Sequence, residues 1–522
     1  METPTTSTYE QERRTKVQKL RELGLEPFGG QTPGIQPLAL IKSVYKPEMG
    51  HDGGPPVKAA GRVILKRDMG KLSFLTLRDE TGDLQVALDK KRLSDLQWQV
   101  RCLIDLGDII AVEGPLGVTN KGEITIWATS LAMASKALLP PPAKWEGLSD
   151  VELRYRQRYV DLFANPQVMA TLKLRIRIVE EVRQFMRDRG FIEVETPMMQ
   201  PIAGGAAARP FVTHHNALNI PLYLRIAPEL YLKRLLVGGF AKVFELNRNF
   251  RNEGISPRHN PEFTMLEAYE AFGSWQTMAE LVESMICHVA EKLFGTLKIE
   301  HKNADGTVRR TINLEGDTTK PAGQRWRRVR MADLVEEHTG WHFDKNKLQD
   351  APPAVMSRIL DLYAEKLQLT GPRDQSAHYR TFIHHLDRMS PAEQLQEVYE
   401  KLIEPTLIDP TFVTHVPSVI IPLAREARDD PFFADVYELA INGQEISPGY
   451  SELNDPDIQA QHFQHQVGDE QQKMDDDFIN ALKHGMPPAG GMGMGIDRLV
   501  MTLTGAESIR DVILFPLMKP IE

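Results

Sequence analysis

The sequence lacks the features of a membrane or secreted protein. No apolar run reaches the roughly 20 residues that a membrane-spanning helix needs. The N-terminal region is polar and has no apolar secretion segment, and the two cysteines, Cys102 and Cys287, are too few for a disulfide framework. We therefore expect a soluble protein of the reducing cytoplasm that does not contact a membrane.

The sequence also lacks a repeat of fixed period and any low-complexity tract. Its formal net charge of -9 argues against indiscriminate binding of nucleic acid, although a partner can still bind a local basic patch. With 522 residues the chain is longer than one hydrophobic core usually organises, so we expect at least two domains.

Residues 1–145 predict a helix followed by a small barrel. Residues 9–21 are basic with apolar residues at helical spacing, and residues 57–135 contain five strand-like stretches with one helix before Gly107. Five short strands with such a helix are typical of an OB barrel. A proline-rich linker spans residues 137–150, so we place the domain boundary between residues 145 and 146.

Two residues of this barrel are candidates for contact with RNA. OB barrels bind single strands with aromatic side chains that stack on bases and polar side chains that read base edges. Phe74 and Gln85 fit these two roles. Because strands favour aromatic residues for packing alone, a place for Phe74 in the barrel core is the competing interpretation.

The second domain, residues 146–522, predicts an α+β fold. Apolar residues recur every three or four positions from Leu172 to Met186, which indicates a helix that Gly190 can end. The segment FIEVETP then alternates like a strand and stops at the rigid Pro197. Residues 300–400 are polar and variable in pattern, and no chemistry is assigned to them.

Three segments of this domain carry candidate chemistry. Residues 243–269 predict a strand, a charged loop and a second strand, with Arg248, Arg251, Arg258 and His259 around the loop. The guanidinium groups of arginine can bind the oxygens of a polyphosphate with paired hydrogen bonds. The competing interpretation is that these residues form salt bridges to neighbouring glutamates.

In the second segment, GGMGMG precedes a helix from about Ile496 that carries Arg498, and its glycines permit close approach of a flat ligand. They match neither a GxGxxG fingerprint nor a Walker loop, which disfavours Rossmann dehydrogenases and P-loop enzymes. In the third, Glu438 and Glu445 flank a predicted hairpin at Asn442-Gly443. Two interpretations of these glutamates stay open: they bind magnesium, or they are solvated surface residues.

Together these segments resemble the three motifs of class II aminoacyl-tRNA synthetases: GFIEVETPMMQ, FRNEGISPRHNPEF and GMGMGIDRLVM. The strings GGAAARPF, THHNALN, RIAPELYLKRL and RDVILFP resemble the bacterial lysyl-tRNA synthetases of subclass IIb in particular. The resemblance spans nearly the whole chain and is weakest in residues 300–400.

The resemblance implies an antiparallel sheet flanked by helices and a homodimer formed through motif 1 around Pro197. It implies a ligase that converts lysine and ATP to lysyl-adenylate and pyrophosphate and then transfers lysine to the 3' end of tRNA(Lys).

The resemblance also assigns roles to individual residues. Arg251 and Arg498 become catalytic residues that grip phosphates, and Phe263 would stack on adenine against Arg498. ATP would contact Arg251, Glu253, His259, Phe263, Glu438, Glu445 and Arg498. Mg²⁺ would bind Glu438 and Glu445. Lysine would contact Gly205, Glu229, Tyr269, Tyr450 and Glu452, and Phe74 and Gln85 would read the central anticodon uridine.

The sequence departs from the commoner family form near the lysine contacts. Where many members have GNGFSEL, this chain has SPGYSEL, so that Pro448 replaces an asparagine and Tyr450 a phenylalanine. We expect Arg251 or a backbone amide to compensate for the lost side-chain donor, with altered lysine affinity. Val419 also stands where the common form has glutamate.

Three alternatives stay open at this point. One is a paralogue that attaches lysine to a protein, although such relatives lack the N-terminal OB domain. Another is an aspartyl- or asparaginyl-type synthetase, which needs a cationic side-chain pocket and is disfavoured by the APELYLKRL and SELNDP strings. The third is a catalytically dead RNA-binding regulator on the same scaffold.

Overall fold

The protein divides into two compact units. The computed structural model describes residues 8–142, 148–206, 208–345, 352–367, 377–465 and 475–521. Contacts within the chain define one unit over Met1–Ala170 and another over Thr171–Glu522. Within the described ranges, none of the helices combines the length and apolar character that crossing a bilayer demands.

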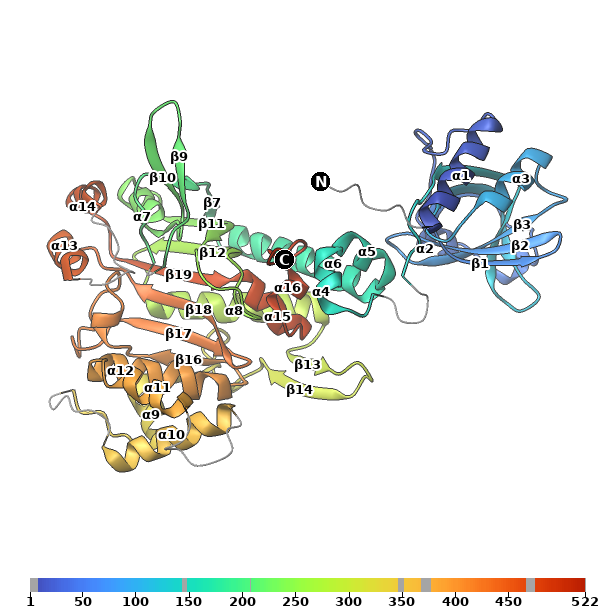
Figure 1. The fold of residues 1–522 in the computed structure, drawn as a ribbon. Coiled ribbons are helices and arrows are strands. Elements are labelled where there is room, and N and C mark those ends of the chain that lie inside the picture. Colours follow the sequence, from blue (N-terminus) through green and yellow to red (C-terminus); the bar gives the residue numbers. More distant parts are fainter. Residues whose placement is uncertain are drawn as a thin grey trace. The chain divides into compact units, whose positions relative to one another are not determined.

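The first unit contains the predicted OB barrel (Figure 1). Its strands are β1 (Pro56–Met69), β2 (Leu72–Arg78), β3 (Asp83–Asp89), β4 (Ile109–Val118), β5 (Ile124–Ala128) and β6 (Ser130–Ser135). The fifth predicted strand is interrupted at Thr129 and continues as β5 and β6, and pairing of β1 with β4 closes the barrel. The helices of this unit are α1 (Thr8–Glu22), α2 (Leu38–Ser43), the 3₁₀ turn η1 (Pro47–Met49), α3 (Asp95–Leu103), α4 (Val151–Arg156) and α5 (Arg158–Ala164).

The second unit is built on an eight-stranded sheet (Figure 1). Its strand order is β15 (Arg327–Arg330), β16 (Thr411–Thr414), β17 (Val436–Ile441), β18 (Gln444–Ser451), β19 (Ala489–Gly495), β12 (Glu262–Ala271), β11 (Lys242–Phe250) and β7 (Ile192–Glu193). The prediction of an antiparallel sheet is right for the six inner strands and wrong at both edges, where β15 pairs with β16 and β7 with β11 in parallel. Parallel neighbours need long crossovers, and helices occupy both connections.

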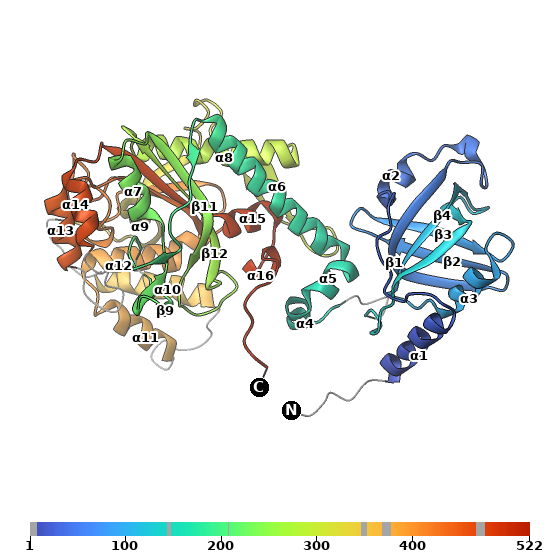
Figure 2. The same ribbon diagram turned by 90° about the horizontal axis from the view of Figure 1, so that it is seen from above.

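Two helices cover one face of this sheet. Helix α8 (Trp275–Phe294) packs along β17, β18 and β19. Helix α6 (Pro166–Asp188), which begins in the first unit, crosses α8 where the Phe185 and His288 rings lie 5.4 Å apart (Figure 2). Met492 and Met494 of β19 belong to the apolar core beneath these helices. The glycines that alternate with them therefore face the opposite side of the sheet.

The remaining elements surround the sheet. They are the strands β8 (Met199–Gln200), β9 (Val212–His215), β10 (Ile220–Leu224), β13 (Lys298–Lys302) and β14 (Val308–Asn313). The helices are α7 (Glu229–Val237), α9 (Met331–Thr339), α10 (Pro353–Leu367), α11 (Ala377–Leu386), α12 (Pro391–Val398), α13 (Pro456–His465), α14 (Asp476–Lys483), α15 (Ile496–Thr504) and α16 (Ile509–Val512). Shorter turns are the π-helical η3 (Tyr399–Ile403) and the 3₁₀ turns η4 (Glu404–Thr406) and η5 (Ser418–Ile420).

Candidate active site

A cavity opens on the glycine face of the sheet. Strand β18 pairs with β19 only from Gly449 to Ser451, and Pro448, which has no backbone N–H, stands where this pairing ends. The space has a volume of about 190 Å³. It is lined by Arg251, Glu253, Gly254, Arg258, His259, Asn260, Pro261, Phe263, Thr264, Met265, Glu445, Ile446, Pro448, Gly495, Asp497, Arg498 and Ile509.

The glycines of β19 leave room for side chains of the neighbouring strand. Gly491 is directly opposite Tyr269 and Gly493 is opposite Glu267 in the antiparallel register. A β-carbon at Gly491 would meet Oε1 of Glu452 and, at 2.6 Å, the Tyr269 ring. The glycine-rich strand thus makes space for a row of polar side chains.

Arg251 immediately follows β11 and lies over an aromatic ring. Its backbone N–H donates to the Pro261 carbonyl at 2.8 Å, which holds the loop between β11 and β12 in place. Its guanidinium carbon is 5.2 Å from the centre of the Phe263 ring. Its buried Nε has no hydrogen-bond partner among the described residues, so the guanidinium retains a donor for a ligand.

Arg498 stands in the first turn of α15, beside the end of β19. Its Nη1 donates to the Glu445 carbonyl at 2.9 Å and lies 3.4 Å from Oε2 of Glu445, and its Nη2 lies 3.3 Å from Nε2 of His259. Partial burial, followed by the charges of Arg498 and Arg251, lowers the pKa of His259. The imidazole is therefore neutral at neutral pH and accepts from Arg498.

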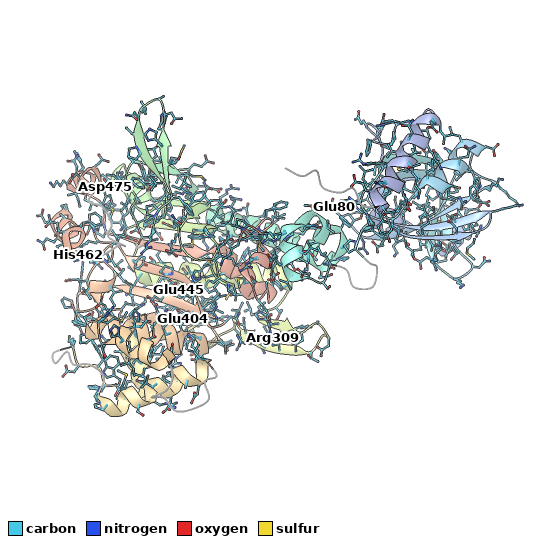
Figure 3. The ribbon with its side chains drawn as sticks, in the orientation of Figure 1. Glu80, Arg309, Glu404, Glu445, His462 and Asp475 are labelled. Carbon is cyan, nitrogen blue, oxygen red and sulfur yellow. The ribbon has the colours of Figure 1, made fainter. Side chains whose placement is uncertain are left out.

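Carboxylates gather at the other side of Arg498. The tight turn at Asn442 and Gly443, with φ of 58° and 71°, brings Glu438 of β17 near Glu445 of β18. Burial and then repulsion by Glu445 hold the pKa of Glu438 well above its usual value. Burial and Glu445 likewise raise the pKa of Glu404 to about 7, and Figure 3 shows Glu404 and Glu445 side by side.

This surplus of negative charge fits a cation. Within the ranges that the structure describes, no group of three or more His, Cys, Asp or Glu side chains has the arrangement of a metal site. Mg²⁺ is usually held by one or two carboxylates, with substrate phosphates and water completing its shell. The pair formed by Glu438 and Glu445 matches that pattern.

The residues predicted to bind lysine form a second cluster, which is buried except for the partly exposed Tyr450. Lys233 Nζ lies 2.8 Å from Oε1 of Glu229 and 2.5 Å from Oε2 of Glu452. Burial raises the pKa of Glu452 to about 7 despite the opposing effect of Lys233. The Glu452 Oε1 atom is buried and has no hydrogen-bond partner in the described part of the chain. Such an oxygen is costly unless a cation or donor joins it.

Gly205, Tyr269 and Tyr450 border this cluster. Gly205 has a φ of +88°, and a β-carbon there would come within 3.2 Å of the Glu229 side chain, so both conformation and space favour glycine. The pKa values of both tyrosines are held well above their usual value by burial first and then by neighbouring carboxylates, including Glu229. Both phenols are therefore neutral.

Two residues of the cluster were missing from the sequence prediction. Lys233 is one helical turn after Glu229, and Glu267 precedes Tyr269 by two residues in β12, so the periods of helix and strand place each on the face of a predicted residue. Tyr269 donates to Oε2 of Glu267 at 3.3 Å. Burial and the charge of Glu229 raise the pKa of Glu267 to about 8.

In the barrel, the two predicted RNA contacts lie on one face. Leu75 and Leu77 belong to the barrel core, whereas the half-buried Phe74 points to the opposite side of β2. Gln85 is buried in β3 and donates to Thr125 Oγ1 at 2.9 Å. Trp127 of β5 lies beside Phe74, with ring centres 6.5 Å apart. The core interpretation of Phe74 is therefore wrong.

Comparison with known proteins agrees with this arrangement. Residues 150–519 match the family of class II tRNA synthetases (D, K and N), and residues 57–133 match the OB-fold nucleic acid binding domain. The chain therefore belongs to the class II tRNA synthetases.

The similar proteins narrow the family further. The chain is 47% identical over 514 residues to the lysine–tRNA ligase of Carboxydothermus hydrogenoformans, which covers 97% of each chain. It is 43% identical to that of Staphylococcus saprophyticus, with 98% of each chain covered. It is 42% identical to that of Bacillus subtilis, covering 98% of this chain and 97% of the relative. Within its class, the chain belongs to the lysine–tRNA ligase family.

Proposed function

We propose that the protein activates lysine with ATP and transfers it to tRNA(Lys). The observation that carries this proposal is the buried Glu452, whose Oε1 lies beside the glycine strand and has no hydrogen-bond partner among the described residues. A lysine ammonium supplies the missing charge and donors. Strand β12 spans both sites, since Phe263 lines the cavity and Tyr269, about 20 Å farther along the strand, borders the carboxylates.

In the first step, a carboxylate oxygen of lysine attacks the α-phosphorus of ATP. The new O–P bond forms as the bond to the bridging oxygen breaks, and pyrophosphate leaves with that electron pair. Arg251 and Arg498 would stabilise the charge on the phosphates, Phe263 would stack on adenine, and Glu253 and His259 would contact the nucleotide. Mg²⁺ held by Glu438 and Glu445 would supply further charge neutralisation at the phosphates.

In the second step, a ribose hydroxyl of the terminal tRNA adenosine attacks the carbonyl carbon of lysyl-adenylate. The ester bond forms, AMP leaves, and the hydroxyl proton passes to solvent or to the departing phosphate. Positioning and charge stabilisation supply most of the rate, so we assign no protein side chain as general base.

Exchange of labelled pyrophosphate into ATP tests the proposal with each of the twenty amino acids. We expect exchange with lysine alone. Exchange with aspartate or asparagine instead of lysine would identify that amino acid as the substrate. No exchange with any amino acid would favour a catalytically dead regulator.

We propose that the barrel reads the anticodon and that its domain ends near residue 145, since the two family matches leave residues 134–149 between them. Phe74→Ala is expected to raise KM for tRNA by about 10- to 100-fold, because stacking on a base contributes roughly 1–3 kcal/mol. Gln85→Ala is expected to act in the same direction. Charging kinetics with tRNA(Lys) measure both effects.

Pyrophosphate exchange is the internal control for these barrel variants. It requires no tRNA, so it should keep its wild-type rate in both. An unchanged KM for tRNA in Phe74→Ala would show that this face of the barrel does not bind the anticodon.

Lysine binding is expected to weaken as the pH falls. The carboxyl groups of Glu267 and Glu452 have pKa values of about 8 and about 7, and cationic lysine favours their ionised forms. Protonation below these values removes the charge, so the lysine dissociation constant should rise by up to about tenfold per pH unit for each carboxyl group as the pH falls from 8 to 6. Calorimetric titrations at several pH values measure this. A constant affinity between pH 6 and 8 would contradict it.

We also propose a homodimer through the region around Pro197. Ile176, Ile192 and Met199 are 50–57% exposed in the segments on either side of this residue, and burial of these side chains by a second copy would stabilise a dimer. Light scattering is expected to give twice the chain mass of 59.0 kDa. A monomer at micromolar concentration would contradict the proposal.

A further inference from the structure

A lysine of the chain itself lies within the buried carboxylate cluster of the candidate amino-acid site. Lys233 is fully buried on α7, and its ammonium bridges Glu229 of the same helix and Glu452 of the neighbouring strand region. The same ammonium lies 3.3 Å from the Leu423 carbonyl, to which it donates. Both carboxylates therefore share one internal cation.

The charges around Lys233 can be counted. Glu229, Glu267 and Glu452 contribute three carboxylates when ionised, and Lys233 contributes one ammonium. Tyr269 and Tyr450, which also face Glu452, remain neutral because their pKa values are raised. Two formal negative charges are left when all three carboxylates are ionised, and the charges of Arg225 and Arg251 also act on Glu267. A free lysine brings two ammonium groups, one on its α-carbon and one on its side chain.

The ion pairs also determine which oxygen is free. Lys233 engages Oε2 of Glu452, whereas Oε1 points toward the space beside Gly491 and Tyr269 and has no partner in the described residues. Without Lys233, the buried carboxylate would lose both its orientation and the positive charge that favours its ionised form.

We propose that Lys233 is a positioning residue that determines lysine specificity. It orients Glu229 and Glu452, it favours the ionised form of Glu452, and it sets the pocket charge to match a diamino acid. This inference rests on the proposed function, because it concerns the lysine pocket of that reaction.

Fold support alone does not explain the placement of Lys233. Helix α7 is anchored by Leu230, Leu232 and Leu236, which pack in an apolar cluster with α13 and α14 residues. A buried ion pair is weak evidence for stability, since its desolvation offsets much of its attraction. Burying the Lys233 ammonium costs desolvation free energy. We attribute its presence to the orientation and charge that it gives to Glu229 and Glu452.

Two variants test the proposal, with lysine and ATP affinities measured separately by calorimetry. Lys233→Gln removes the charge but keeps hydrogen-bond donors, and Lys233→Arg keeps the charge. The matched control is Lys242→Gln, which removes an ion-paired lysine at the surface of β11. We expect Lys233→Gln to weaken lysine binding by about 100-fold or more, with ATP affinity changed by less than about threefold.

The pH profile separates a positioning role from a structural one. Wild-type lysine affinity should level off above about pH 8, whereas that of Lys233→Gln should continue to rise, because Glu452 has lost its neighbouring cation. Lys233→Arg should keep lysine affinity within about tenfold of wild type, with an unchanged profile.

The inference is overturned if Lys233→Gln binds lysine within threefold of wild type, or if lysine and ATP affinities fall together with an unchanged pH profile. Should Lys233→Gln not fold, a folded Lys233→Arg that has lost more than a hundredfold in lysine affinity overturns it equally. Failure of the proposed function appears differently, as a wild-type enzyme that does not respond to lysine.

Discussion

Glu452→Gln is expected to raise KM for lysine by about 1,000-fold or more. The lysine ammonium would be buried without its charged partner, and such a mismatch in a polar site is strongly unfavourable. The amide keeps the shape of the side chain but removes its charge. Lys233 and the substrate ammonium would then compete for Glu229 and Glu267 alone. Lysine-dependent pyrophosphate exchange measures the effect, and KM for ATP should change little.

The matched control for this variant is Glu426→Gln, an exposed glutamate at the isolated bridge to Ala434. It should behave as wild type. A Glu452→Gln enzyme that kept its lysine KM would place the side-chain ammonium elsewhere and remove the main support for lysine as substrate.

Arg251→Gln is expected to lower kcat for adenylate formation by about 100- to 1,000-fold, the loss typical of removing one charge-stabilising donor. The guanidinium lies against Phe263 in the cavity, and its Nε has no hydrogen-bond partner within the described part of the chain. Glutamine can neither carry the charge nor bind a phosphate with two parallel donors. Single-turnover formation of lysyl-adenylate measures the chemical step directly.

Arg327→Gln is the control for this second variant, because Arg327 lies on the exposed edge strand β15 and pairs with Glu337 at the surface. Exposed pairs contribute little, so its rate should match wild type. Equal rates for Arg251→Gln and Arg327→Gln would exclude Arg251 from catalysis.

Local patterns in the sequence predicted the elements that carry the site. Alternating residues and a charged loop predicted β11 and β12, which span Lys242–Phe250 and Glu262–Ala271. The turn at Asn442-Gly443 and the helix from Ile496 are confirmed as well. These features depend on neighbours in the sequence, where hydrophobic period and turn chemistry act.

Features that depend on distant contacts were not predictable. The divergence of β18 from β19 at Pro448 creates the cavity, and nothing in the separate strands specifies their register. In the sequence, Lys233 cannot be distinguished from an ordinary surface lysine of a helix. Its ion pair with Glu452 forms only when the chain after β18 packs against α7. Glu404 follows residues 300–400, for which the sequence showed no recognisable pattern. Its proximity to Glu445 was therefore not predictable.

In the proposed enzyme, Glu452 receives the side-chain ammonium of lysine while Arg251 and Arg498 hold ATP. A crystal structure with L-lysine and a non-hydrolysable ATP analogue tests it most directly. We expect the ammonium within hydrogen-bond distance of Glu452 Oε1, Lys233 still paired with Oε2, and adenine stacked against Phe263. An ammonium bound away from Glu452, or an analogue outside the cavity of Arg251 and Arg498, would contradict it.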